Sequence, residues 1–201
     1  MRILSALLAI TLLASPTFAQ TDWSLIATKL AESVVYVEGP QGSCTGWVIN
    51  NEKDLIITAA HCDQETLFAD LVPVKVQAKD VKNDFLILKA EGIDRPALKL
   101  AKVDAKLGDV IASYGYGWGL EKPLFRIHHV SQVDVQFPNL PGTYTTTDTT
   151  FVAGMSGGPV VNARGEVVMI VQRGSDAVGI GIPASFIQSK VGRYFEGGES
   201  K

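Results

Sequence analysis

Short runs of apolar residues follow one another along the chain from residue 34 onward, and Gly, Pro, Asn and Asp separate them. Runs of this length, interrupted in this way, are typical of β-strands in barrels and sandwiches. The sequence therefore predicts an all-β fold. The predicted strands are Val34–Val37, Gly46–Asn50, Leu55–Thr58, Val74–Ala78, Phe85–Lys89, Val110–Ser113, Ile127–Val135, Val160–Val161 and Val167–Val171.

Helical periodicity occurs near the two ends of this β-rich region. Apolar residues recur at a helical spacing between Asp22 and Ser33, which predicts a short helix leading into the first strand. Ala184–Phe195 carries apolar side chains along one face, which predicts a closing amphipathic helix. The tail Glu196–Lys201 is expected to fray.

Residues 1–19 have the composition of a secretory signal peptide. Arg2 supplies a positive charge, Ile3–Leu13 is apolar but short for a bilayer span, and Ala19 is suited to cleavage after it. An uncleaved anchor or a buried helix is the alternative. The sequence predicts a secreted or periplasmic protein whose mature chain, residues 20–201, has no membrane span.

Charge and length narrow the function classes further. The 201-residue chain has a formal net charge of −3, and no run of Lys or Arg stands out. Nucleic acid and anionic lipid are therefore not expected partners. The mature segment is long enough for one compact unit or for two small barrels that share a cleft. The sequence leaves the oligomeric state open, with a monomer favoured.

Three short motifs carry side chains suited to acyl transfer. His61 lies in Thr-Ala-Ala-His-Cys, Asp84 precedes an apolar run, and Ser156 lies in Gly-Met-Ser-Gly-Gly-Pro. A serine hydroxyl needs a base to remove its proton as it attacks a carbonyl, and an imidazole titrates near neutrality. A carboxylate on the other ring nitrogen fixes the tautomer. Each motif alone is more often a turn, a strand end or a cap, but together they predict a catalytic triad.

The order His, Asp, Ser along the chain is that of chymotrypsin-type proteases. On these motifs the chain resembles the trypsin/chymotrypsin superfamily, over nearly all of its length after the first twenty-odd residues. The resemblance implies two six-stranded antiparallel β-barrels, at about 34–105 and about 106–183, a C-terminal helix at 184–195, and an active site between the barrels. It also implies that the backbone N–H groups of Gly154 and Ser156 bind the oxyanion, and that no metal or organic cofactor takes part.

Cys44 and Cys62 are the only cysteines, and an even count in an exported protein favours a disulfide. The resemblance sharpens this expectation, since the chymotrypsin group joins the corresponding strand to the residue directly after the catalytic histidine. A zinc site made of Cys44, His61 and Cys62 is disfavoured, because the sequence lacks paired C-x-x-C ligands.

Several features resemble bacterial and HtrA-type members more than digestive trypsins. Met155 stands where the digestive group has an aspartate, so activation by a newly cut N-terminus is not expected. The N-terminal helix and the segments Val161–Val167 and Gly179–Ala184 also resemble HtrA proteins. Those proteins normally carry a PDZ domain after the protease, and none is expected here.

The resemblance also places a specificity pocket. The segment Val-Met-Ile-Val-Gln-Arg-Gly, which includes Gln172 and Arg173, resembles the strand that pairs with the substrate. Thr150 would lie at the base of the pocket, with Gly174 and Gly179 in its walls. Because the base lacks the trypsin-like aspartate, a neutral or apolar substrate side chain is expected rather than Lys or Arg. Arg173 is interpreted as a solvated edge-strand charge, with a subsite for acidic residues as the alternative.

The resulting prediction is an exported serine endopeptidase that acts on peptides or proteins. A catalytically silent, protease-like binding module and an esterase with the same triad are the alternatives. The intact set of His61, Asp84 and Ser156 argues against the silent module. His128 and His129 are interpreted as ordinary surface or core histidines, not as a second catalytic or metal pair.

Overall fold

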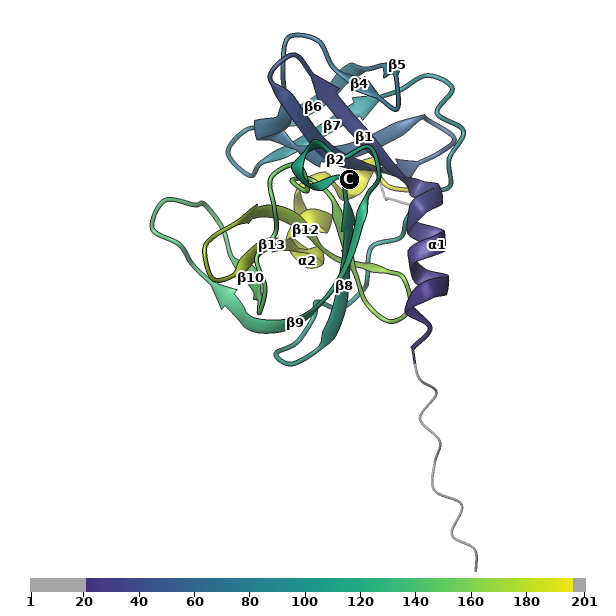
Figure 1. The fold of residues 1–201 in the computed structure, drawn as a ribbon. Coiled ribbons are helices and arrows are strands. Elements are labelled where there is room, and N and C mark those ends of the chain that lie inside the picture. Colours follow the sequence, from purple (N-terminus) through teal and green to yellow (C-terminus); the bar gives the residue numbers. More distant parts are fainter. Residues whose placement is uncertain (1–20, 197–201) are drawn as a thin grey trace, which may run out of the picture.

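The computed structural model describes residues 21–196. The predicted signal peptide, residues 1–19, and residues 197–201 of the predicted tail Glu196–Lys201 lie outside this range. Two β lobes are stacked on each other, and helix α1 (Trp23–Ser33) runs along one side of them (Figure 1). The helix begins where predicted, because Asp22 Oδ1 accepts a hydrogen bond from the Leu25 N–H at 3.0 Å. At its other end Arg95 Nη1 donates to the Ala31 carbonyl at 3.1 Å.

The first lobe is one antiparallel sheet with the strand order β5-β4-β1-β2-β3-β7-β6. Within the described residues its hydrogen-bond ladder stays open, whereas the resemblance implied a closed six-stranded barrel. β4 and β5 are each two residues long, and Pro73 in β5 has no N–H to extend the ladder. The strands are β1 (Val34–Gly39), β2 (Gly42–Asn50), β3 (Leu55–Ala59), β4 (Phe68–Ala69), β5 (Val72–Pro73), β6 (Lys75–Asp80) and β7 (Phe85–Lys89).

The second lobe is a closed six-stranded barrel in the order β10-β13-β12-β11-β8-β9, as expected. β10 and β13 are absent from the strands predicted by the hydrophobic pattern. β10 consists of Tyr144 and three threonines, and β13 contains two glycines, so neither has the apolar run that marks a strand. The strands are β8 (Val110–Gly115), β9 (Leu124–Val135), β10 (Tyr144–Thr147), β11 (Pro159–Val161), β12 (Val167–Gly174) and β13 (Gly179–Pro183).

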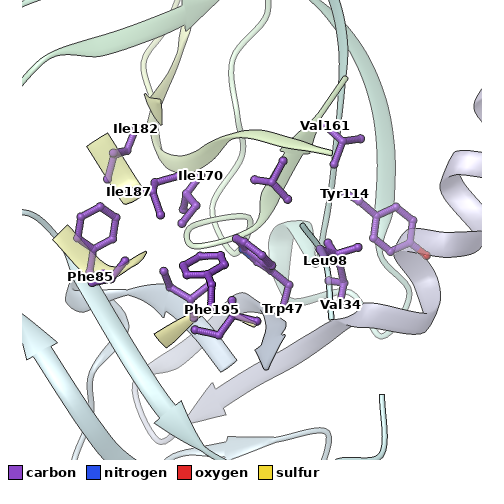
Figure 2. Close-up of a cluster of buried hydrophobic side chains, with 14 of the residues drawn as sticks. Val34, Trp47, Phe85, Leu98, Tyr114, Val161, Ile170, Ile182, Ile187 and Phe195 are labelled. Atoms are coloured by element: carbon purple, nitrogen blue, oxygen red, sulfur yellow. The ribbon is translucent and has the colours of Figure 1, made fainter. Parts of the chain in front are cut away.

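The main hydrophobic core lies between the two lobes. Trp47 and Phe85 come from the first lobe, Ile170 from the second, and Ile187 and Phe195 from the C-terminal segment (Figure 2). The rings of Trp47 and Phe195 are 5.7 Å apart. Burying a large apolar side chain stabilises a fold by about 1.5–3 kcal/mol, so this shared core holds the lobes in one relative position.

The C-terminal segment is helical as predicted, but in two pieces. Helix α2 (Ala184–Val191) is followed by the 3₁₀ turn η3 (Gly192–Tyr194). Ser185 N–H donates to Asp104 Oδ1 at 2.8 Å, which attaches the first turn of α2 to the segment between the lobes. None of the helices within residues 21–196 is long and apolar enough to cross a membrane.

The connection between the lobes crosses near Leu98 and Lys99. The Leu98 N–H donates to the Val48 carbonyl in the first lobe at 3.0 Å, and the Lys99 carbonyl accepts from Val167 in the second at 2.8 Å. The polypeptide therefore contacts both lobes before β8 begins. The predicted division between barrels near residue 105 stays a prediction.

Candidate active site

The pairing of β3 with β7 brings His61 and Asp84 together. Ala59 lies opposite Phe85 in the ladder, so the turn η1 (Ala60–Cys62) and the residue before β7 meet at the same sheet end. His61 Nδ1 lies 2.9 Å from Asp84 Oδ2, and the His61 backbone N–H donates to Asp84 Oδ1 at 2.9 Å. Asp84 adopts a positive φ of 62°, a conformation that aspartate tolerates better than most residues.

Exposure differs between these two side chains in the way that acid–base chemistry needs. The His61 side chain is 45% exposed, so its ring reaches the surface. The Asp84 side chain is 13% exposed and receives two hydrogen bonds from His61. The carboxylate is thus held in one orientation behind an accessible imidazole.

The predicted disulfide is present. Cys44 on β2 and Cys62 at the end of η1 are bonded, with their Cα atoms 6.1 Å apart. The bridge therefore attaches the residue after His61 to the neighbouring strand. The cysteine sulfurs lie near the His61 ring, but their disulfide bond leaves no thiolate to bind a metal.

Ser156 lies in the loop between β10 and β11, on the second lobe. The conformation of this loop requires a glycine at position 154. Gly154 has a φ of +92°, and a Cβ there would overlap the Tyr116 carbonyl. Across the lobe boundary, the Thr45 N–H donates to the Ser156 carbonyl at 2.9 Å. The loop is thereby attached to β2, the strand that also carries Cys44.

The backbone N–H groups around Ser156 divide into two sets. Those of Met155, Gly157 and Gly158 donate to carbonyls at 3.1, 2.8 and 2.9 Å. Those of Gly154 and Ser156 have no acceptor within residues 21–196. Two uncommitted donors in one tight loop form an arrangement that can bind a negatively charged oxygen.

Gln172 connects Ser156 to Asp84. The Ser156 hydroxyl donates to the Gln172 carbonyl at 3.5 Å, and the Gln172 side-chain amide donates to Asp84 Oδ2 at 3.1 Å. Among the residues described, the hydroxyl has no hydrogen bond to His61, so it must leave the Gln172 carbonyl before it can transfer a proton there. Catalytic hydrogen bonds are often long or misaligned without substrate.

Comparison with known proteins assigns a family to this arrangement. A model of the trypsin-like peptidase domain matches residues 44–170. The chain belongs to the trypsin-like peptidase family.

Solved structures of this fold superpose on nearly the whole chain. The active form of the Rv3671c protease from M. tuberculosis has a TM-score of 0.74 and 21% identity, covering 99% of this chain and 96% of that one. The HtrA-type protease AlgW with a tripeptide has a TM-score of 0.75 and 21% identity, covering 88% and 64%. Likenesses at this identity establish the fold of the trypsin-like domain.

Sequence relatives point to the HtrA and DegP proteins. Serine protease HTRA4 of Homo sapiens is 24% identical over 196 residues, which is 85% of this chain and 41% of the relative. A probable periplasmic serine endoprotease, DegP-like, of Pseudomonas fluorescens is 32% identical over 127 residues, or 61% of this chain and 25% of the relative. The chain thus spans less than half the length of these curated relatives.

The residues predicted to form the specificity pocket lie together in this trypsin-like domain. Gly174, at the end of β12, pairs with Gly179, at the start of β13. The Gly174 Cα faces the Thr150 hydroxyl and the Phe151 carbonyl, and a Cβ on Gly179 would lie 2.7 Å from the Phe151 ring. Thr150 and the two glycines therefore lie next to one another.

Two polar contacts near this pocket were not anticipated from the sequence. Arg126 Nη1 donates to the Thr150 carbonyl at 2.9 Å, from strand β9. The exposed Arg173 donates through Nε to Gln172 Oε1 at 2.6 Å. Arg173 is thus not only a solvated charge, because it also fixes which way the Gln172 amide faces. No sequence motif marks either contact, since the first joins residues 24 positions apart and the second depends on the side-chain conformations of two adjacent residues.

His128 and His129 point to opposite sides of β9. His128 is 1% exposed, and its ring lies 2.7 Å from Ser113 Oγ and 2.5 Å from Thr149 Oγ1. Burial, and then the charge of Arg126, lowers the pKa of His128 to about 4. His129 is exposed and pairs with Asp148 at 2.9 Å. One histidine therefore belongs to the core and the other to the surface.

Proposed function

We propose that this chain is a serine endopeptidase that cleaves peptide bonds through an acyl-enzyme. His61 acts as the general base, Asp84 as the carboxylate that orients His61, and Ser156 as the nucleophile. The observation that carries the proposal is the 2.9 Å contact from His61 Nδ1 to Asp84, linked to Ser156 through Gln172. Membership of the trypsin-like peptidase family supports the same roles.

The chemistry follows from this placement. His61 Nε2 removes the Ser156 proton as Oγ attacks the substrate carbonyl, and Asp84 stabilises the imidazolium that forms. The N–H groups of Gly154 and Ser156 bind the oxygen that becomes negative. His61 then gives its proton to the leaving amine, and the same groups activate a water that releases the acyl product.

Substrate peptide adds to the edge of β12 as an extended strand, alongside Gln172, Arg173 and Gly174. The side chain before the cut enters the space between Thr150, Gly174 and Gly179. A hydroxyl and two glycines offer no charge to neutralise Lys or Arg, and the walls approach closely. The preferred side chain is therefore small and neutral or apolar.

The protein acts outside the cytoplasm, in the periplasm or the medium. The predicted signal peptide with cleavage after Ala19, the Cys44–Cys62 disulfide and the periplasmic DegP-like relatives support this location. The proposed protease domain is residues 20–201, divided near residue 105, and its proposed oligomeric state is a monomer. Protein or peptide is its substrate.

Digestion of an unbiased peptide library by the mature chain tests the proposal. Ser156→Ala is the matched control, because it removes one hydroxyl and should preserve the fold seen by circular dichroism. Cleavage by the native chain, absence of cleavage by Ser156→Ala, and fluorophosphonate labelling only of the native chain are expected. Equal cleavage by both proteins would refute the assignment of Ser156.

The same samples separate the two alternative functions. Peptide binding without any turnover or labelling would identify a silent binding module. Hydrolysis of activated esters without cleavage of any library peptide would identify an esterase. The intact His61–Asp84 contact favours the peptidase over the silent module.

A further inference from the structure

Thr45, which no sequence motif marks, contacts several parts of the candidate active site. It lies on β2 directly after Cys44 and is completely buried. Its hydroxyl donates to the Gly154 carbonyl at 2.8 Å and accepts from the Tyr116 N–H at 2.9 Å. Its backbone N–H donates to the Ser156 carbonyl at 2.9 Å. One residue thus joins the first lobe to the nucleophile loop at two points, once through its hydroxyl and once through its backbone N–H.

Thr45 also contacts the segment that carries the histidine. The Thr45 carbonyl accepts from the Thr58 hydroxyl at 2.8 Å, and Thr58 lies on β3 shortly before His61. Gly157 fits between them, since a Cβ there would overlap the Thr58 hydroxyl. The histidine segment and the serine loop therefore meet at the same buried threonine.

The turn η2 (Gly117–Gly119) completes the set of contacts around Gly154. Trp118, which has a left-handed φ of 56°, donates its N–H to the Ala153 carbonyl at 2.6 Å. Thr45 holds the neighbouring Tyr116 N–H and also the Gly154 carbonyl. The carbonyls on both sides of the Gly154 nitrogen and Cα are thus fixed, one by the turn and one by the threonine.

This anchoring decides where the Gly154 N–H points. In a trans peptide the C=O and N–H point in opposite directions, so a carbonyl of Ala153 held at Trp118 turns the Gly154 N–H away from that turn. Without the Thr45 hydroxyl, both the Gly154 carbonyl and the Tyr116 N–H lose a buried partner. The Gly154–Met155 peptide would then lose the anchor of its carbonyl. The segment that leads into η2 would lose its attachment to β2, and η2 is what holds the Ala153–Gly154 peptide, so the Gly154 donor would shift.

We infer that Thr45 is a positioning residue that holds the Gly154 N–H in the orientation that binds the oxyanion. The inference rests on the proposed peptidase function. It assigns the role to the Thr45 hydroxyl and not to the volume of the side chain. Gly115 and Gly158 already confine that volume, because a Cβ built on them would lie 3.2 and 3.1 Å from Thr45 Cγ2.

The test compares Thr45→Val, which keeps the shape and removes the hydroxyl, with Thr45→Ser, which keeps the hydroxyl. Removing an oxyanion donor typically costs 10²–10³-fold in kcat, so we expect Thr45→Val to lose about 10²-fold in kcat with KM within about threefold. Thr45→Ser should recover activity to within about threefold of the native chain. Affinity for a peptide aldehyde, which forms a tetrahedral adduct on serine, should fall in parallel with kcat.

Thr146→Val is the matched control. Thr146 is also completely buried, and its hydroxyl bonds to Ser131 in the second lobe at 2.9 Å, away from the Gly154 loop. It should lower the urea midpoint without changing kcat or the aldehyde affinity. If Thr45→Val does not fold, Thr45→Ala takes its place with the same expected kinetic loss.

Three outcomes have distinct meanings. A folded Thr45→Val or Thr45→Ala with native kcat and aldehyde affinity would overturn the inference. A loss in Thr45→Ser as large as in Thr45→Val would also overturn it, because the hydroxyl would then not be responsible. A native chain that cleaves no peptide would refute the proposed function itself, and the inference with it.

Discussion

The side-chain amide of Gln172 donates a hydrogen bond to Asp84 Oδ2 at 3.1 Å, across the boundary between the two lobes. Gln172 is 2% exposed, and Arg173 holds its amide oxygen at 2.6 Å, so the NH₂ group faces Asp84. The acid therefore receives hydrogen bonds from both lobes. The orientation of the Asp84 carboxylate therefore depends on the relative position of the two lobes.

Gln172→Leu is expected to lower kcat by about tenfold with little change in KM. A hydrogen bond to a charged group contributes about 1.5–3 kcal/mol, and only part of that is lost from the transition state. Steady-state kinetics on one peptide substrate measures the effect. Arg173→Gln, which leaves the amide in place, should cost less; a larger loss there would contradict the role assigned to Gln172.

Asp84→Asn is expected to lower kcat by about 10⁴-fold at neutral pH while the fold persists. The amide keeps the shape of the carboxylate but favours the wrong imidazole tautomer, as established for this triad in other proteins. Stopped assays with concentrated enzyme and circular dichroism check both parts. Activity near that of the native chain would show that Asp84 is not the acid of the triad.

Cys44→Ala/Cys62→Ala is expected to lower the free energy of unfolding by about 3 kcal/mol. The bridge closes a loop with a sequence separation of 18 residues, and the chain-entropy model gives that magnitude for a loop of this size. Urea unfolding of the native and double-variant chains measures it. Dithiothreitol should destabilise the native chain only, and equal midpoints without reductant would contradict the prediction.

Stability is expected to fall as pH drops from about 6.5 towards 4, partly because of His128. Burial lowers the pKa of His128 to about 4 in the folded protein, whereas an unfolded histidine titrates near 6.5. Between these values the unfolded chain binds a proton that the folded chain does not, so acidification favours unfolding. The loss is on the order of 3 kcal/mol.

Urea midpoints at pH 7 and pH 4.5 check this contribution in three chains. His128→Gln should show a smaller decrease between the two pH values than the native chain. His129→Gln is the control, because His129 is exposed and its ring pairs with Asp148 at the surface. An unchanged decrease in His128→Gln would rule out His128 as the source.

Local sequence patterns predicted much of the fold and of the candidate site. Asp22 marked the start of α1, and the run Phe85–Lys89 coincides with β7. Cys44 and Cys62 form the bridge that the resemblance implied. These features depend on neighbouring residues or on a motif of fixed spacing, so the amino-acid sequence is enough to find them.

The sequence alone determined the all-β class, the family motifs at His61, Asp84 and Ser156, and the pairing of the cysteines. Only the tertiary structure decided the open ladder of the first lobe and the contacts of Thr45, Gln172 and Arg126. Each of these contacts joins a strand residue to a loop residue far away in the sequence, and those of Thr45 and Gln172 cross the lobe boundary. Their geometry is set by how the shared core packs, and no spacing along the chain encodes it.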